Sequence, residues 1–357
     1  MRIYQRQVEM KMQARSNRIE YIDIAKGMAI LCVIMGHMGW EYADRIIYPF
    51  HMPLFLICSG YFISEKKDFK AFRKEKMKRL ILPYLVTCAC VCVLSIMANL
   101  VQGMMDKILP DLAKWVYASL YGSCIDYEFP FYIKGIGQIW FLLALFWALL
   151  IVKFFGAMKE RVIIIPLLAY MAYISSQYLW MPFSIQAGAV SALFVWTGYE
   201  LKNHQILNEK NDAWIAMFAF AVWGFEAYFN IRVNICNNTI DNGIFSIAGG
   251  VIISYAVIWF AKVLMHINFL RTPLVFLGRN SLLILCFHEL ETFFFPWSIV
   301  YEFFGRIKVI GLWADIIIFI LKVFFAIICT VVATKLVYKP LQKCGFVENG
   351  RRGNYDI

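Results

Sequence analysis

The sequence predicts an all-α, polytopic integral membrane protein with about ten transmembrane helices, and two observations support that prediction. First, 61% of the 357 residues are hydrophobic and only 17% are charged, whereas an ordinary soluble domain is about 45–50% apolar and about 25% charged. Second, the apolar residues come in many runs of roughly 18–24 residues, each long enough to cross a ~30 Å hydrocarbon layer. The composition therefore excludes a disordered chain and argues against a single soluble domain.

Ten spans account for these apolar runs. The second span contains Pro49 and Pro53, and the ninth is short and carries charges, so these two are the least regular. The expected spans are roughly 22–39, 46–63, 80–103, 136–156, 162–179, 184–200, 213–230, 243–264, 281–296 and 311–338.

The distribution of basic residues predicts the topology. If the N-terminus is cytoplasmic, most of the 35 Lys and Arg residues fall in inner segments, where such residues collect. We therefore expect both termini in the cytoplasm. No cleavable signal peptide is expected, because the segment before the first apolar run is polar and basic and no small-residue cleavage site follows that run. The predicted divisions are a cytoplasmic segment over 1–20, one transmembrane domain over 21–340 and a cytoplasmic tail over 341–357.

Net charge and cysteine content also limit which partners and metals are expected. A net charge of +11 would suggest nucleic acid for a soluble protein, but in a membrane protein it reports topology, so we expect no nucleic-acid partner. Most of the ten cysteines lie inside apolar runs and are interpreted as small core hydrophobes. Zinc-type spacings are absent from the sequence, and the three span histidines lack the tight spacing typical of metal ligands, so we expect no metal.

Ionisable residues at membrane depth are costly and indicate function. In the first span, Asp23, Lys26 and His37 share one helical stripe, because eleven residues are three turns plus about 20°. His37 then lies ~16 Å beyond Lys26, toward the outer side. Two interpretations remain open: a functional stripe, or a structural Asp23–Lys26 ion pair with His37 as a satisfied core histidine.

The second span places His51 between Pro49 and Pro53. Proline removes a donor and clashes with the preceding turn, so the sequence predicts broken backbone here, which is tolerated at membrane depth only where it is packed in protein or lines a cavity. His51 is accordingly a candidate cavity residue on the same side as His37. The alternative is a kinked helix in which His51 bonds a freed carbonyl.

Eight Lys and Arg residues crowd the segment from Lys66 to Arg79. This pattern is typical of topology sorting and of binding to anionic lipid. The sharper interpretation is a cytoplasmic phosphate-binding patch, because Arg matches phosphate geometry.

The ninth span carries His288 and Glu291 three residues apart on one helix face. They suit a base and its orienting carboxylate, or a proton relay. An interhelical hydrogen bond is the structural alternative.

Several stretches in family order make the chain resemble the membrane-bound acyltransferase-3 family of bacterial O-acyltransferases, in its compact ten-helix form without an SGNH domain. The resemblance extends from about residue 20 to 340. Its motifs are Tyr21-Ile22-Asp23-Ile24-Ala25-Lys26-Gly27 leading to His37; Phe50-His51-Met52-Pro53-Leu54-Phe55 with Ser59-Gly60-Tyr61; Arg79-Leu80-Ile81-Leu82-Pro83-Tyr84; Ile139-Trp140-Phe141-Leu142; and Gly278-Arg279-Asn280-Ser281-Leu282 before His288.

This resemblance implies transfer of an acyl group, acetyl by expectation, from cytoplasmic acetyl-CoA to a hydroxyl of a cell-envelope glycan or lipid-linked sugar. It implies a multi-pass protein of the bacterial plasma membrane, in contact with membrane lipid and with biosynthetic partner proteins. The family commonly has Arg where this chain has Lys26. The lysine keeps the positive charge but lacks the planar guanidinium that binds an anion with two parallel hydrogen bonds.

The resemblance also distributes roles among the residues. It implies that His37 is the essential catalytic group, with His51, Lys26 and Asp23 as further catalytic candidates. The donor candidates are Lys78, Arg79, Tyr84 and Trp140, and His288, Glu291, Arg279 and Asn280 are other site candidates.

Two rival functions remain open at this stage. Similar bundles serve as membrane modules in amino-acid transport, and intramembrane His, Lys and Asp suit a proton-coupled carrier. The other rival is a catalytically silent member that flips an acyl donor or scaffolds a biosynthetic complex. Direct transfer and an acyl-histidine intermediate are equally compatible with the sequence.

Overall fold

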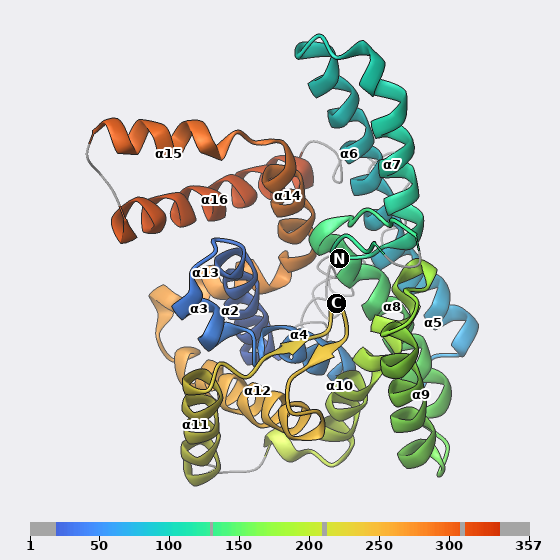
Figure 1. Cartoon of the computed structure of the whole chain (residues 1–357). Helices are drawn as coiled ribbons and strands as arrows, with labels where there is room; N and C mark the ends of the chain where they lie inside the picture. Colours follow the sequence, from blue (N-terminus) through green and yellow to red (C-terminus); the bar gives the residue numbers. More distant parts are fainter. Residues whose placement is uncertain (1–18, 129–130, 209–212, 308–310, 336–357) are drawn as a thin grey trace, which may run out of the picture.

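The computed structural model describes residues 19–128, 131–208, 213–307 and 311–335 (Figure 1). The predicted cytoplasmic tail over 341–357 and nearly all of the N-terminal segment over 1–20 lie outside the described residues. The predicted all-α fold is confirmed in the described part, whose regular elements are helices apart from a short hairpin of the two-residue strands β1 (Val233–Asn234) and β2 (Thr239–Ile240) and an isolated bridge between Tyr127 and Ile133.

Helices dominate the described residues. In order they are α2 (Glu20–Gly36), α3 (Glu41–Ile47), α4 (His51–Tyr61), α5 (Phe69–Lys76), α6 (Leu82–Val101), α7 (Ile108–Tyr121), α8 (Trp140–Phe155), α9 (Arg161–Ser176), α10 (Ile185–Asn203), α11 (Ala213–Tyr228), α12 (Ile244–Leu264), α13 (Asn268–Arg279), α14 (Ser281–Phe294), α15 (Trp297–Arg306) and α16 (Leu312–Ala333).

Several of these helices suit a membrane. In the described part, four continuous helical stretches are long and apolar enough to cross one: Phe69–Val101, Gly137–Phe155, Ile244–Leu264 and Leu312–Ala333. The pair α13 and α14 makes a fifth if the two helices, bent by 74° at their junction, are one broken span. The chain therefore has the helices of a multi-pass membrane protein. Each of the ten expected spans contains a helix, and that ten of them cross the membrane stays a prediction.

The second expected span differs from its prediction in where the backbone breaks. The break precedes His51, in the Tyr48–Phe50 turn between α3 and α4, and α4 itself runs regularly from His51 to Tyr61. Pro53 is accommodated because it lies in the first turn, where the missing N–H would have had no intrahelical partner. The expectation that His51 cannot sit in a regular helix was therefore wrong: His51 is the first residue of one.

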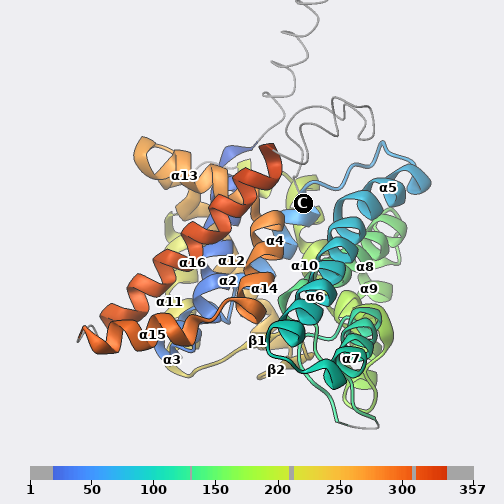
Figure 2. The same cartoon turned by 90° about the horizontal axis from the view of Figure 1, so that it is seen from above.

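The helix α2 lies at the centre of the bundle and packs against α4, α12 and α13 (Figures 1 and 2). Its contact with α13 is backbone to backbone. A Cβ added at Gly278 would overlap the carbonyl oxygen of Asp23, and one added at Gly27 would overlap that of Leu274. Small residues at such crossings let membrane helices approach closely. This contact places the first motif of the sequence, which contains Asp23 and Gly27, against the last one, which begins at Gly278.

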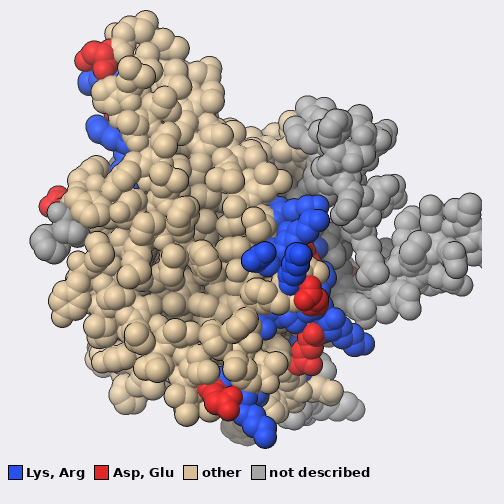
Figure 3. Space-filling view, turned by 90° about the vertical axis from the view of Figure 1, so that its right-hand side faces the viewer, with Lys and Arg blue, Asp and Glu red and all other residues tan. Residues whose placement is uncertain are grey.

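Away from this centre, α6 and α7 form an arm that projects from the bundle (Figures 1 and 2). Figure 3 shows one face of the molecule, on which Lys and Arg gather at one side and a broad uncharged area separates them from the charges opposite. Such a belt between two charged rims is the pattern of a protein surrounded by lipid.

Candidate active site

The ring of His37 lies at the C-terminal end of α2, where it caps the helix. Its Nδ1 lies 2.6 Å from the carbonyl oxygen of Val33. Because a carbonyl oxygen only accepts, Nδ1 carries the proton, and the neutral ring keeps its lone pair on Nε2. The side chain is exposed. His37 thus combines a basic nitrogen with an exposed side chain.

A buried polar cluster lies against this ring. The rings of His37 and His288 are 5.4 Å apart in an edge-to-face arrangement. The Nδ1 of His288 donates to Oε1 of Glu291 at 2.7 Å, within α14. Lys322 of α16 donates to both oxygens of Glu291 at 3.1 Å, and the indole of Trp297 donates to the same carboxylate. We call His37, His288, Glu291 and Lys322 the outer histidine cluster.

This cluster leaves an acceptor without a donor. His288 and Glu291 are almost fully buried, and Nε2 of His288 has no hydrogen-bond partner among the described residues. Since Nδ1 is protonated toward Glu291, this Nε2 also carries a lone pair. The two histidines therefore offer two accepting nitrogens to a donor that enters beside them.

His51 joins the same neighbourhood through Tyr48. Its Nδ1 donates to the carbonyl oxygen of Ile47 at 3.0 Å, and its ring meets that of Tyr48 edge-on at 5.1 Å. The Tyr48 hydroxyl lies 3.4 Å from the carbonyl oxygen of Gly36, beside His37. Since His288 lies against His37 and Tyr48 links His51 to the residue before His37, the structure brings all three span histidines into one neighbourhood.

The other end of α2 carries a separate set of ion pairs. The Nε of Arg279 lies 3.0 Å from Oδ2 of Asp23, and Arg279 and Arg271 both reach Glu20. Lys26 is completely buried in this region. Asp23 thus pairs with Arg279 of α13, which the sequence stripe alone did not indicate. We call Asp23, Arg279, Glu20 and Arg271 the inner ion-pair network.

Asn280 has a local role at the bend between α13 and α14, because its side-chain amide donates to the carbonyl oxygen of Phe276 at 2.8 Å. The structure therefore separates two sequence candidates, Arg279 and Asn280, from His288, with which they share a motif.

The donor candidates lie on different elements. Lys78 is exposed and Arg79 half-buried on a π-helical turn over Met77–Ile81, where Arg79 pairs with Glu75 at 3.3 Å. Tyr84 is buried, and its hydroxyl donates to the carbonyl oxygen of Ser119 at 2.6 Å. Trp140 is buried at the start of α8. No single cluster within the described residues unites these four side chains.

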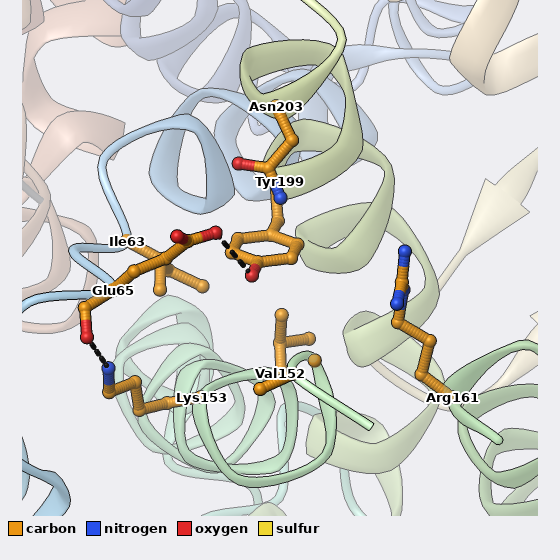
Figure 4. Close-up of a pocket in the computed structure, with 9 residues that line it drawn as sticks. Ile63, Glu65, Val152, Lys153, Arg161, Tyr199 and Asn203 are labelled. Atoms are coloured by element: carbon orange, nitrogen blue, oxygen red, sulfur yellow. Dashed lines mark hydrogen bonds between the residues drawn. The ribbon is translucent and has the colours of Figure 1, made fainter. Parts of the chain in front are cut away.

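A cavity of about 360 Å³ lies apart from both groups, where α4, α8 and α10 end and α9 begins. Figure 4 shows Glu65 between two partners: its carboxylate accepts from the Tyr199 hydroxyl at 2.8 Å, and its carbonyl oxygen from Lys153 at 3.2 Å. Arg161 lines the far side and pairs with Glu200 at 2.7 Å. The charges here are already matched by neighbouring side chains and backbone.

Sequence reasoning missed Lys322, Trp297 and Tyr48. Lys322 had a signal, since a lysine inside an apolar span is costly without a partner. The two aromatic residues had none, because aromatic side chains are common throughout the chain. Among the described residues, no three His, Cys, Asp or Glu side chains gather as metal ligands would.

Comparisons with known proteins identify the family of the chain. The family model described as "Acyltransferase domain" matches residues 19–335. The nodulation protein NolL of Mesorhizobium japonicum is 28% identical over 153 residues, or 39% of this chain and 36% of that protein. NolL of Sinorhizobium fredii is 25% identical over 157 residues, or 40% of this chain and 38% of that protein.

The aligned part thus spans less than two fifths of the length of either relative, and no solved structure matches the chain. The family match, in contrast, covers all of the described residues, including both ends of α2, the bend between α13 and α14, and Lys322. The resemblance noted in the sequence is confirmed, and the chain belongs to the acyltransferase 3 family, whose members take an acyl group from a donor.

Proposed function

We propose that this protein is an O-acyltransferase of the bacterial plasma membrane that moves an acetyl group from cytoplasmic acetyl-CoA to a hydroxyl of an envelope glycan or lipid-linked sugar. The observation that carries the proposal is the outer histidine cluster in a chain of an acyltransferase family. The similarity to two nodulation proteins is compatible with this proposal and does not name the acceptor.

In the proposed reaction, Nε2 of His37 takes the proton of the acceptor hydroxyl as its oxygen attacks the thioester carbonyl. The new C–O bond forms, the C–S bond breaks, and the leaving thiolate takes the same proton back from His37 to become free CoA, which restores the neutral ring. The Val33 carbonyl holds the His37 tautomer that this step needs. Positioned general bases contribute about 10²–10⁴-fold to rate.

The neighbouring residues suit the charge that develops. When His37 becomes an imidazolium, Nε2 of His288 is an acceptor beside it, and Glu291 holds the His288 tautomer from the other side. Lys322 neutralises Glu291, so the site does not carry an unpaired carboxylate between turnovers. The proposal also includes ten membrane spans, with the acyl donor bound from the inner face and the acceptor from the outer face.

At the inner side, basic side chains suit the phosphates of CoA. Lys26, Lys78 and Arg79 are the proposed contacts, with Tyr84 and Trp140 along the pantetheine arm. The inner ion-pair network is proposed to hold α2 and α13 in place there. Lipids and biosynthetic partner proteins are the expected neighbours, and neither nucleic acid nor metal is required by this chemistry.

The test is label transfer from radiolabelled acetyl-CoA by purified protein, with and without envelope glycan from the host. Wild type should transfer or slowly hydrolyse the label, and His37→Ala should lose about 10²-fold or more of that rate. His266→Ala is the matched control, because His266 is an exposed histidine on the α12–α13 loop. Equal rates in wild type and His37→Ala would contradict the assignment.

The same experiment separates two routes. Label that remains on wild-type protein after rapid quenching, and is absent from His37→Ala, indicates an acyl-histidine. Label that appears only in product indicates direct transfer.

A carrier is the second candidate, because the buried His288–Glu291–Lys322 set also suits a proton relay. Counterflow of a labelled amino acid in proteoliposomes, with no turnover of acetyl-CoA, would favour it.

A further inference from the structure

A second cavity is lined by residues of α11 and α12 and by Ile231 and Asn242, which flank the hairpin of β1 and β2 in the sequence. Its volume is about 560 Å³, and its lining is mostly apolar. Phe225 and Phe245 line it and are largely exposed, so the cavity opens on the surface of the bundle. The single ionisable side chain among its lining residues is Glu226.

Glu226 is a buried carboxylate without a donor. The residue is 4% exposed, and its Oε2 has no hydrogen-bond partner among the described residues. Burial of an unpaired carboxylate is expensive, and intramembrane carboxylates normally face a partner. The carboxylate also occupies space that only a glycine leaves free, because a Cβ at Gly249 of α12 would overlap Oε1 of Glu226. A glycine at this position lets the carboxylate reach the cavity.

The basic residue that follows α11 in the chain is directed elsewhere. Arg232 follows α11, yet its Nε donates to Asn230 at 3.0 Å and its guanidinium lies over the ring of Tyr48 at 5.5 Å. No Lys or Arg is among the residues that line the cavity. The missing donor must therefore come from outside the described chain or be a proton.

The depth of the cavity suits a lipid headgroup. Glu226 lies two residues before the end of α11 and Gly249 five residues after the start of α12. At 1.5 Å per residue, both are within ~8 Å of the helix ends on the predicted outer side. This is the boundary between headgroups and hydrocarbon, where a polar head meets the carboxylate while acyl chains follow apolar walls.

We propose that this cavity binds the primary ammonium headgroup of a membrane lipid of the phosphatidylethanolamine class, with Glu226 as its anion. An ammonium supplies N–H donors and a positive charge together, and such charge-assisted hydrogen bonds are about twice as strong as neutral ones. The site does not depend on acyl transfer. Gly250, next to Gly249, faces Pro49 and Pro53, so α12 separates the cavity from His51.

The test compares two lipids with identical chains. Phosphatidylethanolamine has N–H donors and phosphatidylcholine has the same charges without them. Native mass spectrometry of detergent-purified protein should show at least tenfold tighter retention of phosphatidylethanolamine. Glu226→Gln should reduce this preference to less than threefold. Glu41→Gln is the matched control, because it removes an exposed outer carboxylate already paired with Arg45, and it should leave the preference intact.

Gly249→Ala provides an independent variant, since its methyl group displaces the carboxylate without changing charge. It should also abolish the preference in protein that elutes as a folded monodisperse species. Equal retention of the two lipids by wild type would overturn the proposal, as would an unchanged preference in Glu226→Gln. A glucosyl diacylglycerol that binds as tightly as phosphatidylethanolamine would overturn the ammonium assignment, because hydroxyl donors would then suffice.

Discussion

The two ends of α2 hold their charges in different ways. At the inner end, Asp23 pairs with Arg279, whose side chain is 34% exposed, and the network continues to Glu20 at the edge of the bundle. At the outer end, Glu291 is enclosed by His288, Lys322 and Trp297, with side-chain exposures of 0–8% for the three ionisable groups. The arginine of the first set is partly exposed, whereas the side chains of Glu291, His288 and Lys322 are buried.

This difference indicates what each set can do. Exposed ion pairs contribute little to stability and are screened by salt. The inner network therefore suits an entrance through which charged ligands bind and dissociate. A buried set is costly to break and holds its geometry. The outer cluster therefore suits chemistry that needs one tautomer and one ring orientation, and its open member, His37, is the one that meets a substrate.

The largest effect is expected from Glu291→Ala. The change leaves Lys322 buried without its anion and frees the His288 ring, so the free energy of unfolding should fall by about 3–5 kcal/mol. Denaturation of the purified protein in mixed micelles measures it. The double variant Glu291→Ala/Lys322→Met should recover part of the loss. A double variant no more stable than Glu291→Ala would show that the pair is not coupled.

A smaller effect is expected where α2 and α13 touch. Gly278→Ala places a methyl group on the carbonyl oxygen of Asp23, so the helices must separate, at a cost of about 1–3 kcal/mol. Gly224→Ala in α11 is the control, because nothing lies within 4 Å of its added Cβ. It should be neutral or stabilise by up to about 1 kcal/mol. Equal effects of the two changes would contradict the close crossing.

The smallest effect is expected from Asp23→Asn. The amide retains an acceptor for Arg279, and Arg279 still has Glu20 and water, so the unfolding free energy should fall by only about 1–2 kcal/mol. Because the pair is partly exposed, the loss should shrink as salt rises from 0.05 to 0.5 M, roughly the range over which the Debye length falls well below ~10 Å. A loss as large and salt-independent as that of Glu291→Ala would remove the distinction between the two ends.

Contacts and positions that lie within a single helix could be predicted from the sequence for both ends of α2. The His288–Glu291 contact follows from a spacing of three residues on one helix, and the structure has it at 2.7 Å. The placement of His37 far along α2 from Asp23 and Lys26 follows from the helical rise. The pairing of Asp23 with Arg279, from a helix more than 250 positions later in the chain, could not be predicted in this way.

The sequence by itself determined the helical membrane class, the family, the candidate histidines and the intrahelical pairs, because composition and helical periodicity are local properties of a chain. The tertiary structure alone decided that Lys322 neutralises Glu291, that His288 meets His37 edge-on, and that Glu226 reaches a cavity beside Gly249. Those contacts depend on how helices cross, and crossing is set by the packing of small residues such as Gly27, Gly249 and Gly278. No periodicity along one segment encodes which other segment will lie against it.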